Sequence, residues 1–232
     1  MDPIRLLLLG HGRMGQLVEE LASQYDCEVA GWLDETNNTS GEGLAAGRWS
    51  GVDAAIDFST AAALVENLPR LAALRINTVI GTTGWQAHEA SLRHVVEQTG
   101  LGVVAAPNFS TGVVLLEALV EYAGRLFGAQ PEPGAWVHEL HHARKVDAPS
   151  GTALMLQKAL VRGGFSRPID MSSTRAGYIP GTHTVGFDAP SETVTLTHVA
   201  RDRATFARGA LQAARWLQGR RGWFTMRDVL GL

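Results

Sequence analysis

The chain opens with an apolar strand, a glycine turn and a helix, and this order restricts its fold more than any other stretch of the sequence. Residues 4–9 form a short continuous apolar run, which is typical of a strand buried in a parallel sheet. The run leads into Gly10-His-Gly-Arg-Met-Gly15 and then into a helical stretch over residues 16–22. Gly10 permits a tight turn, Gly12 lets the backbone approach a pyrophosphate, and Gly15 allows the helix to pack closely on the strand. We therefore expect a dinucleotide-binding fold.

The second expected strand, residues 29–33, ends at Asp34, nineteen positions beyond Gly15. An acid at that place can accept hydrogen bonds from the ribose hydroxyls of a dinucleotide. No Arg or Lys stands next to Asp34 to hold a 2′-phosphate, so the pattern favours NADH. Arg13 in the glycine loop could still support NADPH, and dual use stays open.

Strands and helices continue to alternate through the front half. We expect strands over residues 54–58, 78–80 and 102–106 and a helix over residues 61–74. Three of these segments lead into loops rich in Gly, Thr, Asn and Ser, and ligands of doubly wound sheets bind at the carboxyl ends of the strands. The sequence predicts an α/β fold with a Rossmann-type parallel sheet.

The back half follows a different pattern. It offers helices over residues 113–127 and 153–161, a strand over residues 135–138, and strand-like stretches over residues 175–187 and 192–199. We expect a second α+β domain with a small mixed or antiparallel sheet. A last helix over residues 206–217 should return to the first domain. The predicted boundaries are a dinucleotide-binding domain over residues 1–108, completed by a C-terminal helix over residues 205–232, and a substrate-binding and oligomerisation domain over residues 109–204.

The chemistry is concentrated in residues 139–152, which we place just beyond the predicted strand. Two imidazoles, an ammonium and a carboxylate fall at His141, His142, Lys145 and Asp147. A Pro-Ser-Gly-Thr turn and an apolar helical run follow. His and Lys can deliver protons near neutral pH, and the backbone N–H groups of residues 150–152 at a helix start suit a carboxylate or phosphate. We predict a small anionic substrate.

Bulk properties exclude several classes of protein. The 232 residues, 45% of them apolar, can bury a full core, and the formal charge of −3 provides no broad basic field for nucleic acid or an acidic membrane. The single thiol, Cys27, lies in an apolar run and is expected to be a buried strand residue. The apolar stretch near the N-terminus is too short for a signal sequence or a membrane span, so we expect a cytoplasmic protein without membrane or nucleic-acid partners.

These motifs resemble the 4-hydroxy-tetrahydrodipicolinate reductase family, also called dihydrodipicolinate reductase, of bacterial lysine biosynthesis. The resemblance covers nearly the whole chain. It is carried by Gly10 to Gly15, Asp57-Phe58-Ser59, Gly81 to Gly84, Pro107 to Ser110, Glu139 to Thr152, Arg175-Ala176-Gly177, Gly181-Thr182-His183 and Met226 to Leu230.

The resemblance implies hydride transfer from NAD(P)H to a cyclic, unsaturated imine dicarboxylate. His141 would be the catalytic acid/base and Lys145 a second proton donor, while His142, Gly151 and Thr152 would hold the substrate carboxylates. A homotetramer joined through an extended sheet is also implied, with no metal. The NAD(P)H site would be lined by Gly10, His11, Gly12, Arg13, Met14, Gly15, Asp34, Gly81, Thr82, Thr83, Ala106, Pro107, Asn108 and Phe109.

Two other functions are compatible with parts of the sequence. His138-Glu139-Leu-His-His142 matches the H-E-x-x-H pattern of a zinc metallohydrolase, which requires a helix so that both imidazoles share one face. The approach to His138 reads as a strand, and Pro149 would soon end a helix, which disfavours zinc. A non-catalytic NADH-sensing module would share the front half, but it has no need of proton donors beside an anion site.

Overall fold

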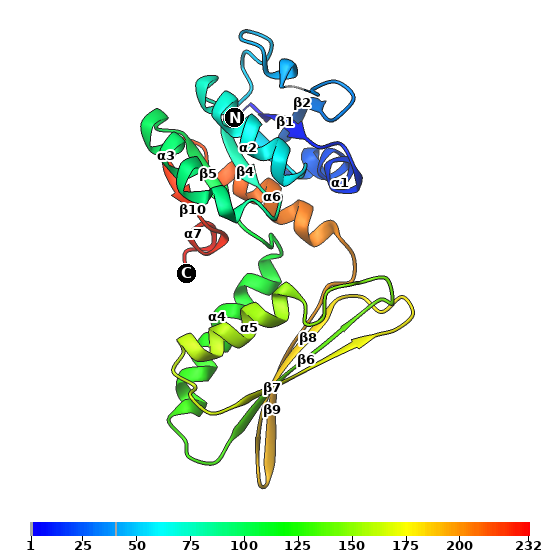
Figure 1. Ribbon diagram of the computed structural model, residues 1–232, viewed down its shortest axis with the longest axis vertical. Coiled ribbons are helices and arrows are strands. Elements are labelled where there is room, and N and C mark those ends of the chain that lie inside the picture. The colour runs from blue at the N-terminus through cyan, green and yellow to red at the C-terminus, as the bar shows by residue number, and fades with distance from the viewer. Residues whose placement is uncertain (1, 40) are drawn as a thin grey trace. The chain divides into compact units, whose positions relative to one another are not determined.

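The computed structural model describes residues 2–39 and 41–232, and these form two compact units (Figure 1). The first unit comprises residues 1–110 and 204–232, and the second comprises residues 111–203. The chain therefore leaves the first unit once and returns to it through its C-terminal segment. Each unit has its own sheet and its own core.

The first unit is built on a six-stranded parallel sheet with the strand order β10-β5-β4-β3-β1-β2. Its strands are β1 (Ile4–Leu9), β2 (Cys27–Leu33), β3 (Ala54–Asp57), β4 (Asn77–Ile80), β5 (Gly102–Ala105) and β10 (Gly222–Phe224). Four leucines of β1, residues 6–9, are at most 1% exposed, as expected for a central strand covered on both faces. The predicted Rossmann-type fold is confirmed.

Helices cover both faces of this sheet. Helix α1 packs against α6 on one face, and α2 packs against α3 on the other. The helical segments are α1 (Arg13–Leu21), η1 (Ala22–Tyr25), η2 (Glu42–Leu44), α2 (Ala61–Ala73), η3 (Gln86–His88), α3 (Glu89–Thr99), α6 (Ala204–Trp216) and α7 (Met226–Leu230). The chain passes from β1 to β2 on one side and then crosses to β3 on the other, so a topological switch lies between β1 and β3.

The second unit is a four-stranded mixed sheet covered by two helices. Its strands are β6 (Gly134–His141), β7 (Ile169–Arg175), β8 (Thr182–Ala189) and β9 (Glu192–Val199), in the order β7-β6-β8-β9. Strand β7 runs parallel to β6, and the other pairs are antiparallel. Helices α4 (Thr111–Gly128) and α5 (Gly151–Arg162) lie side by side and share a core with the sheet (Figure 1).

Two details differ from the sequence expectations. The strand predicted over residues 135–138 continues to His141, so Glu139 and His141 lie on β6 and not beyond it. This matters because strand alternation now decides which side chains face the core. Strands β7 and β10 and helix α3 were not predicted, and β10 consists of only three residues without an alternating pattern. The helix predicted over residues 205–232 is divided into α6, β10 and α7.

Candidate active site

The glycine loop of the first unit has the backbone geometry that its residues predict. Gly10 adopts φ +86°, and a Cβ atom there would lie 2.6 Å from the carbonyl oxygen of Phe58. A Cβ atom on Gly15 would lie 2.2 Å from the carbonyl oxygen of Gly10. At Gly12 a Cβ atom would meet nothing within 4 Å, so this side of the loop is open. Helix α1 starts there without a side-chain cap, which suits a pyrophosphate.

Asp34 follows β2 at the same edge of the sheet. Its Oδ1 accepts hydrogen bonds from the backbone N–H of Thr36 at 2.8 Å and from the Thr36 hydroxyl at 2.6 Å. These hydrogen bonds, the one from the hydroxyl first, hold the pKa of Asp34 below its usual value. The carboxylate is therefore ionised near neutral pH, at the carboxyl end of β2. Nearby, the His11 ring stacks on Trp32 with centroids 4.6 Å apart.

The remaining predicted cofactor residues follow β4 and β5. Asp57, at the end of β3, is fully buried, and its Oδ1 accepts hydrogen bonds from the hydroxyls of Ser59 and Thr82, each at 2.7 Å. It thereby ties the loop after β3 to the loop after β4. Thr82 and Phe109 are 6% and 1% exposed as whole residues, so each offers only a small surface to a ligand. The structure brings all fourteen predicted residues to one edge of one sheet, at Gly10 to Gly15, Asp34, Gly81 to Thr83 and Ala106 to Phe109.

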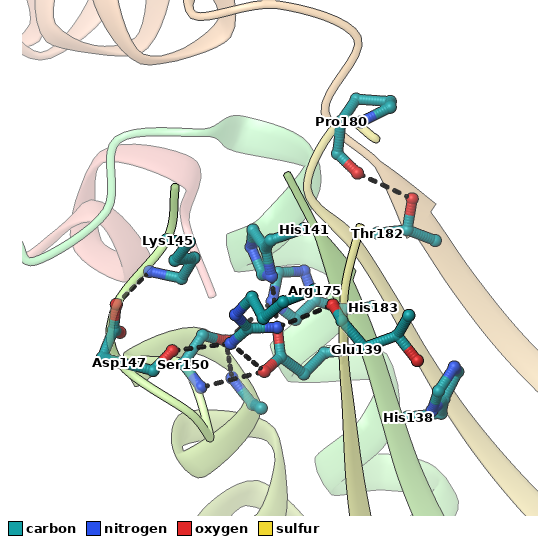
Figure 2. Close-up of polar contacts among 12 residues, drawn as sticks. His138, Glu139, His141, Lys145, Asp147, Ser150, Arg175, Pro180, Thr182 and His183 are labelled. Atoms are coloured by element: carbon teal, nitrogen blue, oxygen red, sulfur yellow. Dashed lines mark hydrogen bonds and ion pairs between the residues drawn. The ribbon is translucent and has the colours of Figure 1, made fainter. Parts of the chain in front are cut away.

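In the second unit, strand β6 divides its histidines between two faces. Val137, Glu139 and His141 lie on one face of β6, the face that packs against α4 and α5. His138 lies on the other face, away from Glu139 (Figure 2). Its Nδ1 is 2.7 Å from the Ser172 hydroxyl of β7. His138 and His142 thus do not share a helical face, so H-E-x-x-H is a chance match here.

Glu139 is the centre of a buried polar network (Figure 2). Its side chain is 0% exposed. Oε1 accepts a hydrogen bond from Nη2 of Arg175 at 2.6 Å and one from the backbone N–H of Ser150 at 3.3 Å. Oε2 contacts Nδ1 of His141. The Ser150 hydroxyl in turn lies 3.1 Å from Nε2 of His183 on β8.

The network separates the pKa values of its members. Burial by itself would raise the pKa of Glu139, but hydrogen bonds from Arg175 and Ser173 and the neighbouring positive charges outweigh it and lower the value to about 2. Burial lowers the pKa of His141, and Glu139 offsets part of this effect. Burial first, and then His141, lower the pKa of His183 to about 4. Near neutral pH Glu139 is therefore charged and His183 is neutral.

Lys145 lies in the loop between β6 and α5. Its Nζ is 2.7 Å from Oδ1 of Asp147, and the hydrogen bond from Lys145 is the first cause of a lowered Asp147 pKa, to which a backbone hydrogen bond from Gly151 also contributes. Ser150 caps helix α5, accepting a hydrogen bond from the Ala153 N–H at 3.2 Å. A cation and a helix N-terminus thus meet around one carboxylate, which is the arrangement that a carboxylate substrate would need.

His142 follows the last residue of β6. Within the described residues, its Nδ1 is buried without a hydrogen-bond partner. The predicted substrate residues His142, Gly151 and Thr152 therefore lie at the end of β6 and at the start of α5, with Lys145 in the loop that joins these two elements.

Sequence reasoning missed three members of this network. Arg175 pairs with His141 in the β6·β7 register, and His183 pairs with Glu139 in the β6·β8 register. Both residues belong to motifs that carry the family resemblance, but no role was predicted for either of them. Ser150 was considered only for its backbone N–H, whereas its hydroxyl caps α5 and contacts His183.

In the part of the chain that the structure describes, Glu139, His141 and His183 form a group that could hold a metal ion. A carboxylate oxygen of Glu139 and one ring nitrogen from each histidine lie within 4.8 Å of one another. A metal ion there would have to displace the contact between Glu139 and His141 and lie beside the Arg175 guanidinium.

Cys27 on β2 is 5% exposed, and burial raises the pKa of its thiol to about 11, which disfavours a nucleophilic role. An open glycine loop in one unit and a histidine–lysine cluster beside a helix start in the other are features of a dinucleotide-dependent oxidoreductase.

Two family models together match nearly all of this chain. The model described as dihydrodipicolinate reductase, N-terminus, matches residues 4–109, and the one described as dihydrodipicolinate reductase, C-terminus, matches residues 112–230. The chain belongs to the dihydrodipicolinate reductase family. It is an oxidoreductase of diaminopimelate and lysine biosynthesis that reduces 4-hydroxy-tetrahydrodipicolinate, and its N-terminal domain binds NAD(P).

Individual relatives agree with this assignment. The 4-hydroxy-tetrahydrodipicolinate reductase of Laribacter hongkongensis is 36% identical over 270 residues, covering 100% of both chains. That of Parvibaculum lavamentivorans is 42% identical over 208 residues, covering 78% of this chain and 73% of the relative. The dipicolinate-bound dihydrodipicolinate reductase of Paenisporosarcina sp. TG-14 has the same fold, with a TM-score of 0.78 at 20% identity over 97% of this chain and 98% of that one. None of the helices in residues 2–39 and 41–232 is long and apolar enough to span a membrane.

Proposed function

We propose that His141 and Lys145 supply the protons for this reduction, and that His142, Gly151 and Thr152 hold the substrate carboxylates. A reduced nicotinamide, when bound, supplies hydride to the substrate. Hydride addition leaves negative charge on a conjugated system, and a proton donor must neutralise it. The observation that carries this proposal is the convergence of His141, Lys145 and the start of α5 on one side of the second unit.

Substrate binding would use charges that the chain already places together. Lys145 and the Gly151 N–H both contact the carboxylate of Asp147. A substrate carboxylate would join or replace Asp147 at these donors. The dipicolinate bound to the Paenisporosarcina relative is a planar dicarboxylate, which supports the same class of ligand for this chain.

The cofactor preference that we propose is NADH, with NADPH as a usable alternative. Asp34 is held ionised by Thr36, and Glu35 follows it, so a 2′-phosphate would meet negative charge. The fit of a dinucleotide is supported by the open side of Gly12 and the uncapped start of α1. Arg13, exposed in the first turn of α1, is the residue that could offset the repulsion.

We further propose that four copies assemble through the sheets of the second units. Strand β9 is an edge strand, and Val194 and Val199 are 41% and 46% exposed on it. An edge of this kind can pair with another chain. Light scattering of the purified protein should give four times the chain mass of 24.9 kDa, and a monomer would contradict this part of the proposal.

The test of the proton donors compares three variants. His141→Gln and Lys145→Ala should each lower kcat with 4-hydroxy-tetrahydrodipicolinate by roughly a hundredfold, because each removes a general acid. His138→Gln is the matched control, since it changes an imidazole on the same strand but on the opposite face. NADH affinity, followed by nicotinamide fluorescence, should stay the same in all three. Unchanged turnover in both His141→Gln and Lys145→Ala would contradict the proposal.

A further inference from the structure

We propose that the buried Glu139 carboxylate, itself held by Arg175, fixes the tautomer and the ring position of His141, so that Nε2 is the atom that exchanges protons with the substrate. The proposal rests on the proposed role of His141 as the proton donor. Glu139 does not touch the substrate in this scheme, so it is a positioning residue.

The place of Glu139 in the sheet is the first argument. It follows Ala135 and Val137 on the face of β6 that packs against the helices, and these two neighbours belong to the apolar core of the second unit. An apolar residue would be expected at this position. An ionised carboxylate there is unfavourable unless it is fully paired, so a simple packing role does not explain it.

The contacts of Glu139 are the second argument. Arg175 and the Ser150 N–H occupy Oε1, which leaves Oε2 to face Nδ1 of His141. An ionised carboxylate can only accept, so Nδ1 must be the donor and carries a hydrogen. In the neutral ring Nε2 is then the unprotonated nitrogen, and it takes up the second proton when the ring becomes charged.

Space around Nε2 is the third argument. Gly181, just before β8, lies beside it, and a Cβ atom on Gly181 would be 3.1 Å from Nε2. A side chain at this position would crowd Nε2, and glycine avoids that, whereas Nδ1 is buried against Glu139. Nε2 is therefore the ring nitrogen that Glu139 leaves free to titrate.

The titratable and charged groups around His141 lie on β6, β7, β8 and the loop after β6. Glu139 lies on the same strand, Arg175 on β7, His183 on β8 with its ring centroid 5.1 Å away, and Lys145 in the following loop. Arg175 keeps the pKa of Glu139 near 2, and the pKa of His183 is about 4, so neither changes charge where His141 titrates. Glu139 is the only one of these four groups that raises the pKa of His141.

The test replaces Glu139 by Gln, which keeps the shape but removes the charge. The Gln amide can donate to Nδ1, so the neutral His141 ring should switch from the Nδ1–H to the Nε2–H tautomer, as seen by ¹⁵N NMR of the cofactor-free protein. The high-pH limb of the kcat/KM profile should move down by about 1 pH unit, because a nearby negative charge is lost. We expect kcat to fall at least about tenfold and NADH affinity to stay unchanged. Asp170→Asn, an exposed acid on β7, is the matched control.

The outcomes separate this inference from the proposed function. A wild-type protein whose neutral His141 is the Nε2–H tautomer would overturn the inference, and this measurement needs no variant to fold. So would an unchanged pH profile in Glu139→Gln while His141→Gln is inactive. If His141→Gln retains full activity, the proposed proton donor itself is wrong.

Discussion

The two units build their proposed ligand sites in opposite ways. The first unit presents backbone, with an open Gly12 and an uncapped helix start, and its side chains mostly serve to hold the loops. The second unit presents side chains whose charges are set by buried partners, above all Glu139 with Arg175. A backbone site should therefore be sensitive to added atoms, and a side-chain network should be sensitive to lost charges.

The largest effect should come from removing a charge in the second unit. Arg175→Ala leaves the fully buried Glu139 carboxylate without its guanidinium, and loss of one partner of a buried ion pair costs about 3–5 kcal/mol. Urea unfolding should report this loss. Arg162→Ala is the control, because its ion pairs with Glu117 and Glu121 are more exposed and should contribute about 1 kcal/mol or less. Equal losses would show that burial of the pair does not matter.

The second effect is a loss of stability in mild acid. The pKa of His183 is about 4 in the folded chain and 6.5 when unperturbed, so between these values only the unfolded chain binds the proton. Stability is then fully present above pH 6.5 and falls as pH drops to 4, by up to about 3 kcal/mol. His141 and His198 also have lowered pKa values and act in the same direction. The free energy of unfolding of His183→Gln should depend less on pH over this range, and an equal slope would contradict the assignment.

The third effect tests the backbone site with two glycines. Gly10→Ala forces a Cβ atom onto a residue with positive φ and against the Phe58 carbonyl, which should cost about 1–3 kcal/mol of stability as well as NADH binding. Gly12→Ala meets no atom of the chain, so it should leave stability unchanged and weaken NADH binding only. Calorimetry and fluorescence titration measure the two quantities. Normal NADH binding by Gly12→Ala would show that the open side of the loop is not the pyrophosphate site.

The smallest effect concerns the ribose. Asp34→Asn removes the ionised acceptor while keeping its size, so NADH affinity should fall by about tenfold. NADPH affinity should fall less or rise, because a repulsive charge near the 2′-phosphate is removed. Fluorescence titration with both cofactors measures the ratio. A parallel loss for both would argue that Asp34 does not set the preference.

The same contrast explains how far the sequence could be interpreted. Strand β1, its glycine loop and Asp34 were predictable because each signal is local, a run of apolar residues or a spacing along one stretch of chain. The roles of Arg175 and His183 were not, because their contacts with Glu139 and Ser150 depend on the register of β6 with β7 and β8. The predicted end of β6 was also too early. The polar residues His138, Glu139 and His141 near its end hide the alternation of apolar and polar residues that marks a strand.

The most direct test is a crystal structure of the protein with NADH and dipicolinate bound together. We predict one carboxylate of dipicolinate at Lys145 and the start of α5, Nε2 of His141 within hydrogen-bond reach of the ligand, and the pyrophosphate of NADH at the glycine loop of the first unit. Dipicolinate bound away from His141 and Lys145, or a metal ion held by Glu139, His141 and His183, would contradict the proposed mechanism.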